Sequence, residues 1–303
     1  MKYRVKFITP GFCAGADQKV AEVRAPSIRA ELRWWFRTLR GTREEEEAVF
    51  GSVAGDEGRS SSVFVRVSNL ERSSNLYDPP FVSPNDPGAY LHYLLTAPND
   101  KEITRMWETP PDAETKTKGR IRENSQIPPG STFDLEISFR RRIGKGPALD
   151  KFREARECFL RFGSIGYRKT RGFGSFMVEE SVASRAEMES WIERLKAKDF
   201  SFELSPAGSP DPLVALRQVE TKLKGNKESQ TGLRLHHPAK TPSPLGYSDG
   251  PGKRQSSAIR FRPVPFRTKS GDLQYSLLIF QAPDRVLGDV VKTAYRGRTR
   301  LLP

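Results

Sequence analysis

Hydrophobic and polar positions alternate with two different periods along the first 180 residues. A period of two, which is typical of half-buried strands, covers residues 3–8, 62–67, 132–139 and 175–179. A helical period covers residues 28–39 and 149–162, and residues 44–50 favour a further short helix. Pro26 and Ser27 stand where the first helix should begin, so we expect Ser27 to cap it.

The resulting order of elements is strand, helix, strand, strand, helix, strand. This is the ferredoxin-like order, so the pattern predicts an α+β domain over residues 1–183. A helix at 185–198 connects it to a weaker copy over 199–303, with strands at 200–204, 259–267 and 273–281, helices at 212–224 and 284–295, and a last strand at 299–302. We therefore predict two tandem ferredoxin-like (RRM-like) domains with insertions.

Two segments interrupt this pattern and read as insertions. Residues 68–131 are rich in Pro, Asn and Asp, and we expect a helix near residues 90–95 and a flexible stretch at 108–122. Residues 225–256 are rich in Gly, Pro, Ser and Lys, and read as a mobile loop.

The net charge of the chain indicates which class of partner it binds. Lysine and arginine number 51 against 37 acidic residues, a formal charge of +14, which favours a polyanionic partner. Two distant cysteines and three histidines do not form a zinc signature, so we predict no metal and no cofactor. No apolar run approaches the roughly 20 residues of a membrane span, and no signal peptide opens the chain. We expect a cytoplasmic protein that does not bind membranes.

Arginines cluster on the helix predicted at residues 28–39. The surrounding segment holds one acid, Glu31, and six arginines: Arg24, Arg29, Arg33, Arg37, Arg40 and Arg43. At 100° per residue, the apolar positions Ile28, Leu32, Trp35 and Leu39 fall within about 60°, and four arginines fall within about 80° on another face. A polyanion bound along that face relieves the repulsion between them.

Two other uses of these residues stay open. The arginines could pair with carboxylates across an interface, and residues 44–47 are four glutamates that could serve some of them. Trp34 and Phe36 lie off the apolar stripe, where core packing or base stacking would use them.

A glycine-rich basic loop covers residues 163–174. Glycine allows close approach to a polyanion, Arg168, Lys169 and Arg171 add charge, and Tyr167 and Phe173 offer stacking faces. The spacing is not that of a P-loop. A purely structural turn would use the same glycines.

These segments together resemble a known family. Residues 22–37 (EVRAPSIRAELRWWFR), the pattern Glu47-x-x-Phe50-Gly51, Ser61-Ser62-Val63, the loop GYRKTRGFG at 166–174 and the start Thr9-Pro10-x-Phe12 resemble the RAMP superfamily. Within it they resemble the first-numbered subunits of Cmr (type III-B CRISPR–Cas) complexes. Ala30 departs from an expected glycine.

The resemblance implies tandem ferredoxin-like domains in a subunit of an RNA-guided antiviral effector complex. It implies binding of single-stranded guide or target RNA beside other complex subunits, with cleavage left to those subunits. The candidate RNA-binding residues are therefore Arg24, Arg29, Arg33, Arg37, Arg40, Tyr167, Arg168, Lys169, Arg171 and Phe173.

We predict no catalytic residue. The sequence has no pair of acids in a two-metal motif. We expect His92, His236 and His237 to be surface or hydrogen-bonded residues. Asp17 is the one isolated acid that remains a candidate for a functional role. Two alternatives remain: a metal-independent endoribonuclease that processes guide RNA with His236 or His237 as base, and a scaffold that binds only protein.

Overall fold

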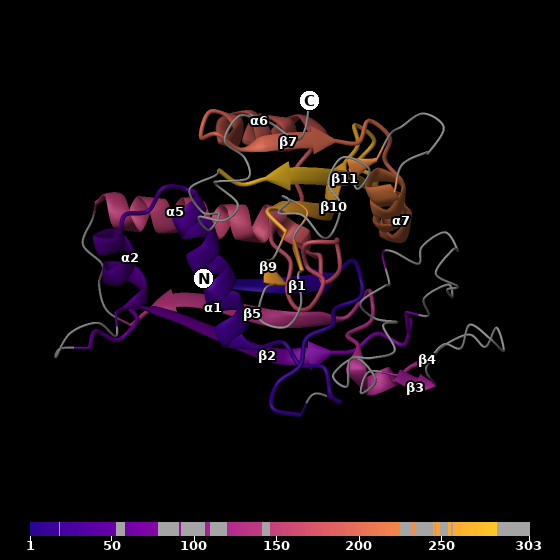
Figure 1. Ribbon diagram of the computed structural model, residues 1–303, viewed down its shortest axis with the longest axis horizontal. Coiled ribbons are helices and arrows are strands. Elements are labelled where there is room, and N and C mark those ends of the chain that lie inside the picture. Colours follow the sequence, from indigo (N-terminus) through magenta and orange to yellow (C-terminus); the bar gives the residue numbers. More distant parts are fainter. Residues whose placement is uncertain are drawn as a thin grey trace.

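The computed structural model describes residues 1–17, 19–52, 58–77, 120–140, 146–224 and 257–283, with short pieces at 91, 107–109, 232–233, 245, 247–248 and 254–255. Figure 1 shows its elements in chain order. They are β1 (Lys2–Phe7), α1 (Ala25–Thr38), α2 (Arg43–Phe50), β2 (Val63–Glu71), β3 (Trp107–Thr109), β4 (Arg120–Ile121), β5 (Thr132–Phe139), α5 (Pro147–Phe162), β6 (Phe176–Val178), α6 (Arg185–Lys196), β7 (Ser201–Leu204), α7 (Pro212–Lys224), β8 (Tyr247–Ser248), β9 (Arg254–Gln255), β10 (Ile259–Arg267) and β11 (Leu273–Gln281).

The first sheet has the strand order β2-β5-β1-β6, and all three of its pairings are antiparallel. Helix α1 connects β1 to β2, and α5 connects β5 to β6. This is the ferredoxin-like arrangement, with its strands in the order second, third, first, fourth. The predicted α+β, ferredoxin-like fold is therefore confirmed.

The second sheet has the order β10-β11-β7, again antiparallel, with α7 between β7 and β10. This is the same arrangement as the second, third and first strands of the first sheet. The helix and strand predicted at 284–295 and 299–302 lie outside the described residues. A complete second ferredoxin-like domain, and the boundaries 1–183 and 199–303, stay predictions.

Both insertions contain short strand pairs that the sequence did not reveal. β3 pairs with β4 at the two ends of the stretch predicted to be flexible, and β8 pairs with β9 within the predicted loop 225–256. Strands of two or three residues are too short for a measurable period. Of the helix predicted near residues 90–95, the structure describes Leu91, which is helical and buried.

The apolar stripe of α1 joins the two sheets into one core. Trp35 is fully buried and stacks on Phe200 and Phe280, with ring centroids 6.0 and 5.6 Å away. Phe280 belongs to β11, and Phe200 precedes β7. The stripe predicted from the helical wheel is therefore confirmed, and it holds the second sheet against the first.

The ends of α1 differ from the predicted ones. The helix begins at Ala25 with Arg24 as its N-cap, so Pro26 lies in its first turn and Ser27 inside it. It ends at Thr38, and Arg40 follows with a φ of 69°. The next helix, α2, begins with a capping box between Thr42 and Glu45.

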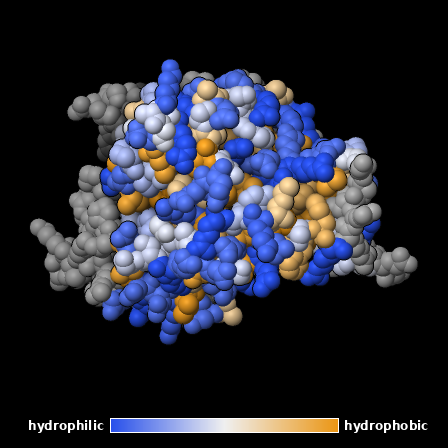
Figure 2. All heavy atoms as spheres, turned by 180° about the vertical axis from the view of Figure 1, so that it is seen from behind, coloured by the Kyte–Doolittle hydropathy of each residue, from blue (hydrophilic) through white to orange (hydrophobic). Residues whose placement is uncertain are grey.

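The surface seen from behind the view of Figure 1 is mostly hydrophilic, and hydrophobic residues form separate groups on it (Figure 2). No helix within the described residues is long and apolar enough to cross a membrane.

Candidate nucleic-acid interface

Three arginines of α1 lie at the surface on one side of the helix. Arg29 is exposed and has no hydrogen-bond or ion-pair partner among the residues that the structure describes. Arg33 Nε lies 2.9 Å from Glu46 Oε1, and Arg37 donates from Nε and Nη2 to the two oxygens of the same carboxylate, each at 2.6 Å. One glutamate therefore serves two guanidinium groups, which leaves an excess of positive charge along this face.

The pairing with Glu46 matches part of the alternative in which the arginines bind nearby glutamates. The Arg37 side chain nevertheless stays 55% exposed, whereas that of Glu46 is 14% exposed. Because Arg37 uses only Nε and Nη2 on Glu46, its Nη1 group stays available to a phosphate.

Arg40 does not extend this face as the helical wheel placed it, and Arg24 lies before the first residue of the helix. Arg40 lies beyond the end of α1, in a left-handed conformation, and forms an ion pair with Asp199. Arg24 caps the helix and lies 3.3 Å from Glu22. The wheel placement of Arg40 was wrong because the helix ends two residues before it.

Arg171 and Phe173 of the glycine loop lie inside the protein. Arg171 is 4% exposed and donates from Nη2 to the Leu245 carbonyl at 2.7 Å and from Nη1 to Ser257 Oγ at 3.1 Å. Phe173 is fully buried and packs against Phe12, with ring centroids 5.4 Å apart. The stacking face predicted for Phe173 was wrong, because the ring fills the core beneath the loop.

Lys169 and the acid of α1 belong to one charge cluster, in which Glu31 and Arg260 are buried and Lys169 is partly exposed. Glu31 is buried and accepts hydrogen bonds from Lys169 and, at 2.8 Å, from Arg260 of β10. The Arg260 guanidinium lies 3.5 Å from the centre of the Trp34 ring. Burial alone would raise the pKa of Glu31, but the charges of Arg260 and Lys169 outweigh it and lower the pKa. Glu31 was not among the residues for which a role was predicted.

The tip of the loop is the part that reaches solvent. Tyr167 is 41% exposed. Arg168 has a φ of 60° and donates to the Leu91 carbonyl at 2.8 Å. Gly174 also has a positive φ, and a side chain there would collide with the Ile165 carbonyl. The glycines therefore shape a packed loop in which Tyr167 is the exposed side chain, while Arg168 and Lys169 are half-buried.

The face of the first sheet opposite its helices carries balanced charges. Arg4 Nη1 donates to Asp134 Oδ1 at 2.9 Å across neighbouring strands. Phe64, on β2, lies under the guanidinium of Arg140 at 5.1 Å. RRM domains usually stack RNA bases on aromatic residues of their central strands. The central-strand positions Arg4 and Asp134 hold charged residues instead.

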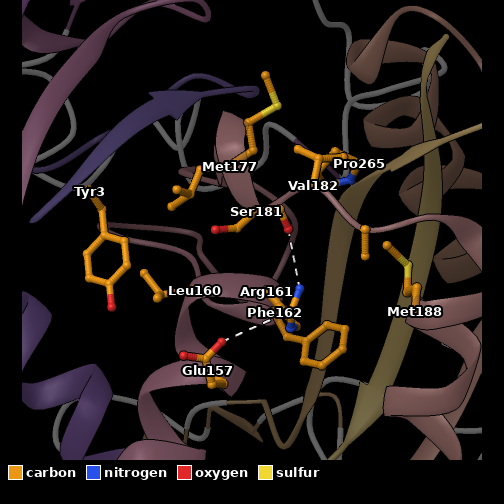
Figure 3. Close-up of a pocket in the computed structure, with 12 residues that line it drawn as sticks. Tyr3, Glu157, Leu160, Arg161, Phe162, Met177, Ser181, Val182, Met188 and Pro265 are labelled. Carbon is orange, nitrogen blue, oxygen red and sulfur yellow. Dashed lines mark hydrogen bonds and ion pairs between the residues drawn. The ribbon is translucent and has the colours of Figure 1, made fainter. Parts of the chain in front are cut away.

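A small cavity lies where the two sheets meet (Figure 3). Its volume is about 70 Å³, and its lining residues include Tyr3, Glu157, Arg161, Met177, Ser181 and Pro265. Arg161 donates to the Ser181 carbonyl at 3.3 Å and lies 3.7 Å from Glu157. Sites for small ligands usually measure about 300 Å³ or more, so this cavity is too small to serve as one.

The remaining candidate groups offer little chemistry within the described residues. Asp17 is exposed, and its Oδ1 accepts a hydrogen bond from the Lys19 amide at 2.9 Å. Burial raises the pKa of the Cys13 thiol to about 12. No group of three or more His, Cys, Asp or Glu side chains that could hold a metal occurs in this part of the chain. His92, His236 and His237 lie outside the described residues.

Two curated proteins are similar to this chain in sequence. Two Cmr subunits of Pyrococcus furiosus (strain ATCC 43587 / DSM 3638 / JCM 8422 / Vc1), Cmr1-2 and Cmr1-1, are each 27% identical to it. The matches cover 58% of this chain and 94% of Cmr1-2, and 77% of this chain and 60% of Cmr1-1. A chain of a type IV-B CRISPR complex matches with a TM-score of 0.36 and 15% identity, over 58% of this chain and 89% of that one.

A family-wide comparison gives the assignment. The family model of the RAMP superfamily matches residues 4–177, which run from β1 to β6 and include α1 and the glycine loop. This match covers more than half of the sequence and part or all of each strand of the first sheet. The chain therefore belongs to the RAMP superfamily.

Proposed function

We propose that the protein is a non-catalytic, RNA-binding subunit of a CRISPR ribonucleoprotein effector complex. Its partners are single-stranded guide or target RNA and other subunits of that complex. Membership of the RAMP superfamily and the similarity to two Cmr subunits support the assignment to a complex. The charge of +14 supports a polyanionic partner.

The arginine face of α1, defined as Arg29, Arg33 and Arg37, carries the proposal of RNA binding. It presents three guanidinium groups at the surface against the single carboxylate of Glu46. Eight residues of helix at 1.5 Å per residue give a length of about 12 Å. That length reaches about two phosphates of extended single-stranded RNA, so several contacts form at once.

Additional contacts are expected near the N-terminus of α1. The amide of Tyr167 donates to the Phe12 carbonyl, and the amide of Glu22 donates to the Cys13 carbonyl. These bonds bring the exposed tip of the glycine loop beside the segment that leads to Arg24. Tyr167 and Arg24 are therefore the second group of candidate RNA contacts, with stacking supplied by the ring and charge by the guanidinium.

The test is RNA binding by the isolated chain across a range of salt. Because counterions are released from the phosphates, log Kd should change with log salt by about 0.7 per phosphate neutralised, and affinity should fall steeply as salt rises. An RNA affinity that does not change with salt concentration would contradict an interface dominated by phosphate contacts. No RNA binding, with assembly into the complex intact, would favour the protein-binding scaffold.

A cleavage assay on the same samples tests the non-catalytic part of the proposal. We expect the RNA to remain intact with and without a chelator. Metal-independent cleavage that is lost when both His236 and His237 are changed to Ala would establish the endoribonuclease instead.

A further inference from the structure

A hollow of about 410 Å³ opens beside the C-terminal half of α1. We call it the α1–α2 hollow. Its size lies within the range of small-molecule sites, about 300–1,000 Å³. Helix α2 lies at the left of Figure 1, away from the glycine loop and near the end of β5. The hollow is lined by Arg33, Arg37, Arg43, Glu46, Glu47, Phe50, Gly51, Ser52 and Arg59.

Positive charge exceeds negative charge in this lining. Four arginines face two glutamates, and Glu46 is shared by Arg33 and Arg37. Arg43 Nε lies 2.9 Å from Glu47 Oε1, and its side chain is largely exposed. Arg59 is exposed and has no acidic partner in the part of the chain that the structure describes. An anion in the hollow therefore meets a formal excess of two positive charges among these residues.

The lining also holds two of its guanidinium groups in fixed positions. Arg33 forms an ion pair with Glu46, donates a hydrogen bond from Nη2 to the Gly51 carbonyl at 3.1 Å, and lies 5.5 Å from the centre of the Phe50 ring. Arg37 uses Nε and Nη2 on Glu46, and this leaves its Nη1 group for another acceptor. A guanidinium that is already oriented loses little conformational entropy when it binds a phosphate.

Gly51 explains how Arg59 comes to this hollow. Ser52 and Arg59 exchange both backbone hydrogen bonds, at 2.9 and 2.8 Å, which brings residue 59 against the end of α2. Gly51 has a φ of 78°, and a side chain there would collide with the Arg59 carbonyl. The close approach of the two segments thus requires glycine at position 51.

We propose that the α1–α2 hollow binds the phosphate group of one nucleotide. Arg37, Arg43 and Arg59 contact the phosphate, while Glu46 is a positioning residue that orients Arg33 and Arg37. The phosphate belongs to an RNA strand or to a free nucleotide, since both present the same group. This inference rests on the proposed function and adds the place where one nucleotide is held.

The test compares two double variants that remove the same charge. R43A/R59A removes the outer arginines of the hollow. R194A/K269A is the matched control, because Arg194 lies on α6 and Lys269 in the turn before β11, both exposed. By fluorescence anisotropy with a short single-stranded RNA, R43A/R59A should bind roughly tenfold more weakly than wild type, with a salt slope smaller by about 0.7, the value for one phosphate. The control should keep the wild-type slope.

Additional ligands identify the source of the phosphate, and one further variant keeps the test valid should the double variant fail to fold. RNA ending in a 5′-hydroxyl and RNA ending in a 5′-phosphate separate an internal from a terminal phosphate, and adenosine monophosphate as competitor tests a free nucleotide. The single charge reversal R59E, at an exposed position, gives the same comparison should R43A/R59A unfold.

Equal losses in both double variants, or no loss in R43A/R59A, overturn the hollow as a binding site. The proposed function survives that outcome, because the wild-type chain still binds RNA. If wild type binds no RNA under any salt condition, the proposed function fails and this inference fails with it.

Discussion

The glycine loop and the arginine face of α1 share one feature of their sequences: both concentrate positively charged residues where few acids lie nearby. In the structure they differ. The loop directs Arg171 inward, to Leu245 and Ser257, whereas Lys169 bonds the buried Glu31 and keeps 36% of its side chain exposed. The arginine face keeps three guanidinium groups at the surface. A basic stretch of sequence therefore does not by itself predict that its side chains face solvent, because their exposure depends on where their partners lie.

The decisive partners are far away in sequence. Arg260, which holds Glu31, is 229 residues from it, and Leu245 is 74 residues from Arg171. Local pattern contains no information on contacts at such separations. Glu46, by contrast, is nine residues from Arg37, and the run of glutamates beside the arginine helix pointed to that pairing.

The largest effect that separates the two regions is expected for Glu31→Gln. Without the carboxylate, the buried Arg260 keeps a charge that has lost its acidic partner, which should lower the free energy of unfolding by about 3–5 kcal/mol. Chemical denaturation measures this. Glu47→Gln, which breaks an exposed pair with Arg43, should cost under about 1 kcal/mol. Equal effects of both variants would show that the Glu31 cluster is no more internal than the surface pairs.

A smaller loss is expected for Arg171→Ala. It removes the donors to the Leu245 carbonyl and Ser257 Oγ and should lower the free energy of unfolding by about 1–3 kcal/mol. Arg194→Ala, at an exposed position over the Trp191 ring, is the control and should change it by under about 1 kcal/mol. If Arg171→Ala left stability unchanged and weakened RNA binding instead, the loop would regain the role first predicted for it.

The pattern of hydrophobic positions predicted much of the fold. β5, β10, β11 and α7 begin and end at the predicted residues, because their signals are local. The end of α1 could not be predicted as well, since Arg40 adopts a conformation usual for glycine. For the candidate site, the exposure of Arg29 and Arg37 followed from the helical wheel. The burial of Phe173 did not, because Phe12 packs on it from another segment.

The smallest effect is a dependence on pH. The pKa of Glu31 is lowered in the folded protein, so its contribution to stability is complete above the unfolded pKa of about 4.3 and is lost as pH falls through the lower folded value. The deficit of Glu31→Gln relative to wild type should therefore stay constant from neutral pH to about pH 5 and shrink below about pH 4. Denaturation at several pH values measures it, and a deficit that grows with acid would contradict the assignment.

The most direct measurement is the RNA affinity of a variant that removes the arginine face and also neutralises Glu46, so that its carboxylate is not left without a partner. R29A/R33A/R37A is combined with E46Q, and E46Q alone is the control. We predict that the quadruple variant binds single-stranded RNA roughly tenfold or more weakly than E46Q, while its thermal unfolding stays near that of E46Q. Wild-type affinity in the quadruple variant would contradict the account, as would its unfolding, which would make these arginines internal ion-pair partners.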